Sequence, residues 1–266
     1  MGALDIWNRS KIGAGEILRS QIGPLVLWFK KTEDELHVAF ERLPEPDTIV
    51  DAEGPTAVDG VESEGLDWGR WIVGDEMNTF QVLPIMPDRP VVVHPELPVK
   101  IPTGHKALFF VSIPVWLRVL AGEKKQIELC EVPVLILSNT WFGDTISGQL
   151  CYSLRSRARR QIKDSESNPY RAVCPVKIRN TSPKQLDIGR LCVHVEHLKT
   201  YIGDKNLWTN EVTITFRGED QAGKIDYSKE RPAFEPIGEM LSDARAPVKE
   251  TILKRSIGGF KLFSGK

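Results

Sequence analysis

Residues 80–114 read FQVLPIMPDRPVVVHPELPVKIPTGHKALFFVSIP, and this stretch is the clearest indication of fold class in the chain. Its apolar runs are short, and prolines stand at positions 84, 87, 90, 95, 98, 102 and 114. Proline lacks a backbone N–H and has a fixed φ, so long helices cannot form here. Each apolar run is restricted to the edge, the end or a bulge of a sheet. The stretch therefore predicts a series of short β-strands joined by turns.

The same pattern continues on both sides of this stretch. Apolar and polar residues alternate, as expected for strands with one buried and one solvated face, at positions 36–40, 150–154 and 212–216. Asn180-Thr-Ser-Pro predicts a turn. From Leu186 the apolar residues stand at even positions, and from Leu191 at odd positions. This change of phase predicts a β-bulge at Gly189-Arg190.

These patterns predict an all-β protein with two antiparallel β-sandwich domains of immunoglobulin-like or jelly-roll type. We place an N-terminal β-sandwich at residues 1–138 and a C-terminal immunoglobulin-like β-sandwich at residues 139–230. Residues 231–266 are expected to form a tail with a short helix. Pro247 suits the start of this helix, and the glycines at 258 and 259 suit its end.

Composition and charge exclude several classes of protein. The chain has 266 residues, of which 41% are hydrophobic and 27% charged, which is ordinary for a globular protein and excludes global disorder. A net charge of −1 argues against a nucleic-acid coat protein, and 21 glycines and 18 prolines argue against a coiled coil. We find no signal-peptide pattern and no apolar run of about 20 residues, so we expect a cytoplasmic protein without a membrane span.

Residue patterns for metal, nucleotide and thiol chemistry are absent or incomplete. The four cysteines, at 130, 151, 174 and 192, form no Cys-x-x-Cys pair, and we predict reduced, mostly buried thiols. His194-Val-Glu-His197 offers at most two ligands on one face of a strand. Gly218 to Lys224 has the spacing of a P-loop, but Ile225 stands where Ser or Thr is required. We predict no catalytic residue, no metal and no cofactor.

The clearest functional feature is a run of arginines in the basic part of the chain. Residues 32–67 carry a net charge of −11, and residues 155–266 carry +8. If the strand at 150–154 continues, alternate arginines share one of its faces. The run comprises Arg155, Arg157, Arg159 and Arg160. Like charges along a strand repel unless an anion compensates them, so we predict a partner-binding or anion-binding surface here.

The compensating anion has several candidates. An acidic surface of a protein partner, lipid headgroups, nucleic acid and the chain's own acidic residues 32–67 all qualify by charge. The run contains no aromatic residue, which argues against a platform for single-stranded nucleic acid. The alternative is a solvated strand end without a partner.

Two tryptophan-containing stretches are candidate ligand sites. Trp68-Gly-Arg-Trp71 places two indoles around Arg70, which suits stacking on a sugar or base while the arginine holds an anion. Trp141-Phe-Gly-Asp144 places a carboxylate beside an aromatic wall. The alternative for the first stretch is that its rings anchor a strand to the core. The alternative for the second is a turn in which the aspartate accepts hydrogen bonds from backbone amides.

These stretches also carry a resemblance to a known family. Asp67-Trp-Gly-Arg-Trp71 leads into the proline-rich strands, and Ser138-Asn-Thr-Trp-Phe-Gly-Asp144 leads into Gly148-Gln-Leu-Cys-Tyr152. Together they resemble, over nearly the whole chain, uncharacterised archaeal and bacterial proteins known only as a domain of unknown function. The resemblance implies no activity. Members tend to be encoded near small mechanosensitive-type channels, which implies a membrane-channel partner.

The function expected from the sequence is a non-enzymatic, cytoplasmic module for protein interaction or regulation that acts through the arginine run. One alternative is a β-sandwich that binds a small ligand or a carbohydrate through the tryptophan stretches. Another is an uncharacterised enzyme on a β scaffold, which would need a cleft of perturbed acids that a sequence does not reveal.

Overall fold

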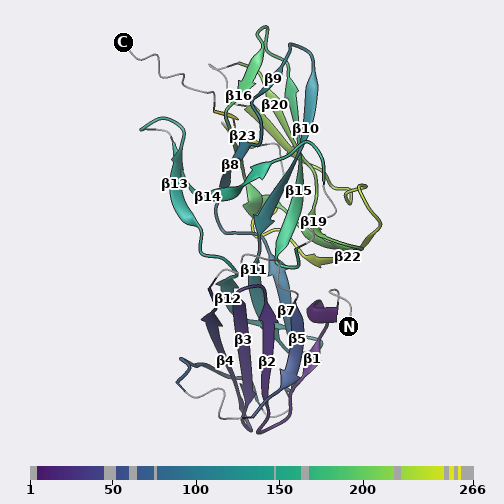
Figure 1. Ribbon diagram of the computed structural model, residues 1–266. Helices are drawn as coiled ribbons and strands as arrows, with labels where there is room; N and C mark the ends of the chain where they lie inside the picture. Colours follow the sequence, from purple (N-terminus) through teal and green to yellow (C-terminus); the bar gives the residue numbers. More distant parts are fainter. Residues whose placement is uncertain are drawn as a thin grey trace. The chain divides into compact units, whose positions relative to one another are not determined.

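The computed structural model describes residues 5–44, 52–59, 65–74, 77–146, 148–162, 168–218, 223–248, 252–254 and 257–258. Among them, the helical elements are single 3-10 turns, such as η1 (Asp5–Trp7) and η4 (Val195–His197), and the other regular elements are strands (Figure 1). The prediction of an all-β protein is confirmed. In this part of the chain, no helix is long and apolar enough to cross a membrane.

The described residues fall into two compact units. Unit 1 lies within Met1–Ile85, Pro114–Leu135 and Asn168–Tyr170, and unit 2 lies within Met86–Ile113, Ile136–Ser167 and Arg171–Lys266. The chain therefore passes between the units several times. The boundary expected at residue 138 lies near one of these crossings, at 135–136.

Unit 1 contains two antiparallel sheets, one of four strands in the order β1-β7-β11-β12 and one of five in the order β5-β2-β3-β4-β6. The strands are β1 (Ser10–Lys11), β2 (Ile17–Ile22), β3 (Leu25–Lys31), β4 (Glu35–Arg42), β5 (Glu53–Ala57), β6 (Gly69–Ile72), β7 (Thr79–Ile85), β11 (Trp116–Ala121) and β12 (Ile127–Pro133). Phe29 of one sheet stacks on Phe80 of the other with ring centroids 4.1 Å apart, so the core of the unit lies between the sheets.

Strand β3 is buried on both faces, which explains why its sequence LVLWF is a continuous apolar run instead of an alternating one. One face carries Phe29. The other carries Val26 and Trp28, which pack with Ala39 of β4 and with the partly buried ring of Trp68. The central strand of unit 1 therefore has a second apolar cluster outside the main core.

Unit 2 contains an eight-stranded sheet with the path β22-β18-β19-β15-β20-β21-β23 and β10 paired to β15, a five-stranded sheet of order β13-β14-β8-β17-β24, and the pair β16-β9. The strands are β8 (Val91–Pro95), β9 (Val99–Ile101), β10 (Lys106–Pro114), β13 (Ser138–Phe142), β14 (Gln149–Ala158), β15 (Arg171–Asn180), β16 (Leu186–Ile188), β17 (Arg190–Val193), β18 (Thr200–Gly203), β19 (Leu207–Thr209), β20 (Val212–Phe216), β21 (Gly223–Tyr227), β22 (Ile237–Ser242), β23 (Ile252–Lys254) and β24 (Ile257–Gly258). Some pairs are parallel: β14 with β8, and β15 with both β19 and β20.

The C-terminal segment differs from the short helix that the sequence predicts. Where described, it forms strands: Ile252 pairs with Ile225 of β21, and Ile257 pairs with Leu191 of β17. A helix this short is marginal in water on its own. The edges of two existing sheets instead offer the segment a ready set of backbone hydrogen bonds.

The change of phase near Gly189 also has a different origin from the predicted bulge. Strand β16 ends at Ile188 and belongs to the two-stranded sheet, whereas β17 begins at Arg190 and belongs to the five-stranded sheet. The glycine therefore marks the point at which the chain leaves one sheet for another. Strand β16 alternates in burial, whereas Leu191 to Val193 of β17 are all buried, and the apolar pattern changes where the chain changes sheet.

All four cysteines are free thiols, and Cys151, Cys174 and Cys192 are buried, in agreement with the sequence prediction. Burial raises the pKa of Cys174 to about 12. Burial, together with two nearby glutamates, raises the pKa of Cys130 to about 11. These two thiols therefore stay protonated at neutral pH, which makes them poor nucleophiles.

Candidate functional site

The arginine run begins on β14, as the sequence predicts, and the local backbone is irregular there. Ser153 pairs with Val92 of the parallel strand β8, and Arg157 pairs with His94, so β14 has two extra residues between these pairs. The extra length is a bulge, a feature that often re-aims side chains near functional sites. Arg155 and Arg157 are both exposed, while Leu154 and Ala158 on either side are buried.

The next two arginines leave the strand face. The backbone of Arg159 exchanges two hydrogen bonds with Phe110 of β10, at N–O distances of 2.7 and 3.0 Å. Its guanidinium Nε lies 3.5 Å from a carboxylate oxygen of Glu96. The Arg160 guanidinium donates to the carbonyl of Leu108 and lies 5.2 Å from the ring centroid of Phe109. These contacts turn the end of the arginine run toward β10.

Arg159 and Arg160 line a pocket of about 150 Å³ within unit 2. Its lining consists of Glu96, Leu97, Val99, Phe109, Ala158, Arg159, Arg160 and Gln161. Four of these residues are apolar and the rest are polar or charged, with two cations against one carboxylate. Leu97 is 71% exposed, so an apolar side chain is accessible at the mouth.

The volume of the pocket limits what it can hold. Pockets for drug-sized ligands measure about 300–1,000 Å³, and this pocket of about 150 Å³ is half of the lower value. The pocket therefore suits one apolar side chain of a partner better than a whole cofactor. The guanidinium groups of Arg159 and Arg160, which follow Arg155 and Arg157 along the chain, suit carboxylates next to that side chain. Within the described part of the chain, no carboxylate pairs with Arg157.

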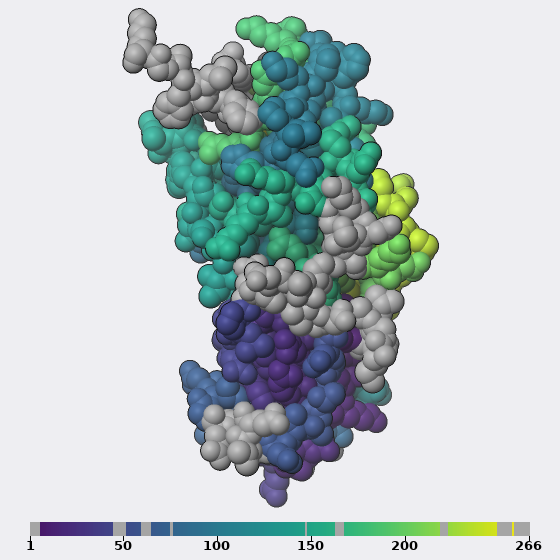
Figure 2. All heavy atoms as spheres, in the orientation of Figure 1, coloured from purple at the N-terminus to yellow at the C-terminus, as the bar shows by residue number. Residues whose placement is uncertain are grey.

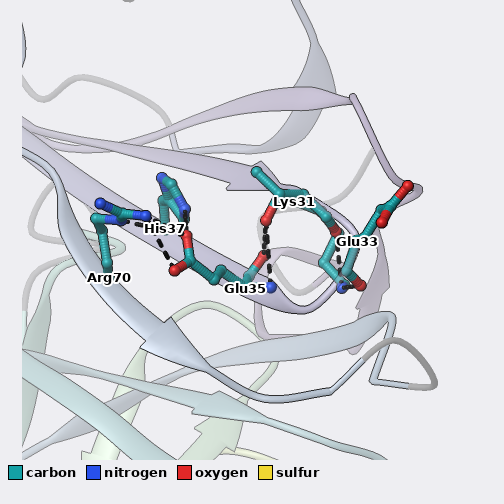
Figure 3. Close-up of polar contacts among 6 residues, drawn as sticks. Lys31, Glu33, Glu35, His37 and Arg70 are labelled. Carbon is teal, nitrogen blue, oxygen red and sulfur yellow. Dashed lines mark hydrogen bonds and ion pairs between the residues drawn. The ribbon is translucent and has the colours of Figure 1, made fainter.

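Arg70 of the first tryptophan stretch is held by an ion pair within unit 1. Its guanidinium donates to both carboxylate oxygens of Glu35 at 2.8–3.2 Å, and Nε2 of His37 lies 2.7 Å from the same carboxylate (Figure 3). The hydrogen bonds from Arg70, and then that from His37, hold the pKa of Glu35 below its ordinary value. The arginine that the sequence offers for an anionic ligand already has a carboxylate partner on β4.

The indoles of Trp68 and Trp71 pack against neighbouring residues of unit 1. Trp68 packs on the cluster of Val26, Trp28 and Ala39, with its ring edge-on to His37 at a centroid distance of 6.3 Å. The ring of Trp71 lies over Gly69, where an added Cβ would come within 2.5 Å of it. This arrangement favours the alternative interpretation, in which the rings anchor strand β6 to the core.

The second stretch forms the turn of the β13–β14 hairpin in unit 2. A carboxylate oxygen of Asp144 accepts the backbone N–H of Ile146 at 2.9 Å, as the turn interpretation predicts. Trp141 is 47% exposed, and its indole N–H donates to the backbone carbonyl of Asp144 at 2.8 Å. Trp68, Arg70 and Trp71 belong to unit 1, so the tryptophan stretches do not combine into one site within either unit.

The strand pattern of His194-Val-Glu-His197 predicts at most two polar groups on one face, but the structure brings all three together in one polar cluster. Residues 195–197 form the 3-10 turn η4 instead of continuing a strand, so the carboxylate of Glu196 lies 3.3 Å from His194 Nδ1 and 3.6 Å from His197 Nε2. Burial alone would raise the pKa of Glu196, but the hydrogen bond and charge of His194 outweigh it and lower the pKa. No three metal-ligating side chains converge in a metal-binding arrangement among the described residues.

This cluster has a structural role. His197 Nδ1 lies 2.5 Å from the backbone carbonyl of Ala246, and the N–H of Ala246 donates to the carbonyl of Glu196 at 3.0 Å. The two contacts fasten the C-terminal segment to η4. The His-x-Glu-His spacing is the sequence pattern that indicates this cluster. It brings both imidazoles to one carboxylate only when the backbone forms a turn, as η4 does.

Comparison with known proteins relates most of the chain to a protein family. The sequence model of a family described as "Protein of unknown function (DUF432)" matches residues 6–262. No curated protein and no solved structure matches the chain.

Proposed function

The chain belongs to the family of proteins of unknown function (DUF432), and from the geometry of its second unit we propose that it is a non-enzymatic protein-interaction module. The observation that carries the proposal is the pocket where β14 ends, whose lining combines four apolar residues with Arg159 and Arg160. In this proposal the partner is an acidic protein segment that carries an apolar side chain. We also propose that each unit is a β-sandwich, the second of immunoglobulin-like type, and that the module acts in the cytoplasm.

The chemistry of the lining supports a peptide partner. An apolar side chain gains about 25 cal/mol for each Å² that it removes from water, and the exposed Leu97 and the partly exposed Val99 supply most of the surface for it. Carboxylates beside it form charge-assisted hydrogen bonds with guanidinium groups, each contributing about 1.5–3 kcal/mol. Both contributions are needed, because the pocket is small and exposed arginines alone bind weakly in salt.

The two alternative functions have less support. The hypothesis of a carbohydrate or small-ligand site relies on tryptophans that pack against the core or lie in the hairpin turn. The pocket is also smaller than a typical small-molecule site. The hypothesis that the protein is an enzyme requires a nucleophile or a general acid in a cleft. Among the described residues, Glu96 is the only carboxylate that lines the pocket, and it lies near Arg159. The family resemblance supports a partner that is itself a membrane channel.

The test uses a fluorescein-labelled peptide, Asp-Glu-Phe-Glu-Asp, and fluorescence anisotropy with the full-length protein at low and moderate salt. Two control peptides separate the contributions: Asp-Glu-Gly-Glu-Asp lacks the apolar side chain, and Lys-Lys-Phe-Lys-Lys lacks the acids. We expect the first peptide to bind at least tenfold more tightly than either control, and more weakly as salt rises.

The variant Arg155→Glu/Arg157→Glu reverses two exposed charges of the site. We expect peptide affinity to fall at least a hundredfold, because each lost contact accounts for about a factor of ten or more. The melting temperature should change little, since both side chains are exposed and an exposed contact, such as the one that Arg155 makes, contributes little to stability. A matched control, Arg179→Glu/Arg217→Glu, makes the same charge change at exposed positions outside the site. Equal losses in the two variants, or no binding by the wild type, would refute the proposal.

A further inference from the structure

The β13–β14 hairpin of unit 2 is a nearly uncharged and partly apolar surface. Residues 136–154 contain one charged residue, Asp144, although 27% of the whole chain is charged. Four large apolar side chains in this segment are solvent-exposed: Ile136 at 74%, Trp141 at 47%, Ile146 at 94% and Leu150 at 44%. Large exposed apolar patches are uncommon on monomeric proteins, and they mark interaction sites.

Strand β13 (Ser138–Phe142) is also an outer strand of its sheet. It pairs with β14 on one side in five consecutive pairs, from Ser138↔Ser153 to Phe142↔Gln149, with no shift of register. On its other side, the described part of the chain contributes no strand. Figures 1 and 2 show the hairpin at the margin of unit 2, open to solvent. Natural edge strands are usually protected by lysine, proline or a bulge, and β13 has none of these.

The exposed indole of Trp141 is held in a fixed position. Its N–H donates to the carbonyl of Asp144, and its ring lies on Gly148, where an added Cβ would come within 2.2 Å of the indole nitrogen. A side chain that is already ordered loses little conformational entropy when it binds. Since its only polar group is satisfied within the hairpin, the indole presents an apolar surface to a partner.

We propose that β13 pairs antiparallel with β13 of a second copy of this chain, about a two-fold axis at Thr140. In this register Asn139 lies opposite Trp141 of the second copy. The two indoles then become diagonal neighbours at about 7–8 Å, which is within reach of aromatic side chains. Leu150 pairs with Trp141 within each hairpin, so the four side chains form one apolar stripe across the joined sheets.

The properties of the strand favour a second copy over a different partner. Two-fold antiparallel pairing brings residues near the axis close to their own counterparts, so like charges there repel one another. Ser138–Phe142 has no charge, and self-pairing therefore has no electrostatic cost. An acidic segment, the partner proposed for the arginine site, finds no cation on this edge. The proposal uses none of the pocket residues and is independent of the proposed function.

The experiment is a charge exchange at Asn139, an exposed position that faces its own counterpart diagonally in the proposed dimer. The full-length wild type and the variants Asn139→Glu and Asn139→Lys are studied by sedimentation velocity from 1 to 200 µM. We expect the wild type to dimerise and each variant alone to have a dimer dissociation constant at least tenfold higher. An equimolar mixture of the two variants should recover dimers, because opposite charges then become neighbours.

A matched control introduces a charge on an outer strand of the other unit. Ile72 of β6 is 82% exposed, and Ile72→Glu should leave the dimer dissociation constant unchanged. Circular dichroism and the melting temperature confirm that each variant is folded. The proposal is overturned if the wild type is monomeric over the whole range, if either variant dimerises as the wild type does, or if mixing the two variants recovers no dimer.

Discussion

Replacing Asn180 with alanine is expected to lower the free energy of unfolding of unit 2 by about 3–4 kcal/mol. Asn180 is the first residue of the predicted Asn-Thr-Ser-Pro turn, and it is 1% exposed. Its amide nitrogen donates to the carbonyls of Ile101 and Lys184 at 2.9 and 2.8 Å. Its amide oxygen accepts the N–H and the hydroxyl of Ser182 at 3.0 and 2.7 Å. Three buried bonds and one partly buried bond, at about 1 kcal/mol each, give the expected loss.

Urea unfolding followed by intrinsic tryptophan fluorescence measures this change by linear extrapolation. The neighbouring Thr181→Ala is the control: its hydroxyl is exposed and makes one hydrogen bond, to the carbonyl of Phe216 at 2.9 Å. We expect it to cost less than about 1 kcal/mol. A loss for Asn180→Ala no larger than that for Thr181→Ala would refute the reasoning, because it would mean that water replaces all four hydrogen bonds of Asn180.

The variant Asn180→Asp tests the effect of a buried negative charge at the same position. The variant keeps both acceptor contacts with Ser182 but loses both donors, and its carboxylate faces two carbonyl oxygens. Burial of that carboxylate raises its pKa in the folded state above the unfolded value. The variant should therefore be most stable below the unfolded pKa and lose stability as the pH rises through the folded pKa. If its unfolding free energy, relative to that of Asn180→Ala, does not fall between pH 4 and pH 7, the carboxylate is not buried as described.

Two further predictions concern ionisable groups. Because Arg70 and His37 hold the pKa of Glu35 below its ordinary value of 4.5, Glu35 stabilises unit 1 fully above that value, and the contribution disappears as the pH falls through the lower folded pKa. The melting temperature should consequently drop less between pH 7 and pH 3 in Glu35→Gln than in the wild type, and an equal drop would contradict this. Because burial raises the pKa of Cys174 to about 12 and Cys151 and Cys192 are also buried, these thiols should react slowly with a disulfide reagent at pH 8 until denaturant is added, when all four cysteines react. Rapid modification of two or more thiols in the folded protein would contradict this prediction.

The candidate site was partly predictable from the sequence. Alternation along 150–158 predicted exposed arginines, and Arg155 and Arg157 are exposed. The pocket was not predictable, because its lining comes from β8 to β10 as well as from the end of β14. Nor does alternation reveal the bulge in β14, since the extra residues are defined only against the neighbouring strand β8.

Local chemistry was enough to establish the strands. Proline spacing in residues 80–114 excluded long helices, and period-two alternation marked half-buried strands, because both effects act within a few residues of the backbone. The turn chemistry of Asp144 and Asn180 was readable for the same reason, since an Asn or Asp side chain bonds backbone groups next to it.

Tertiary structure alone decided which strands pair and what the remaining side chains contact. The C-terminal residues became strands because sheet edges distant in sequence offered them hydrogen bonds, and Gly189 marked a change of sheet instead of a bulge. Arg70 binds the carboxylate of Glu35 on β4, and Trp68 packs on the face of β3 that points away from the main core. Such pairings depend on contacts between segments far apart in the chain, and a pattern with a period of two specifies which face of a strand is buried but not which neighbour buries it.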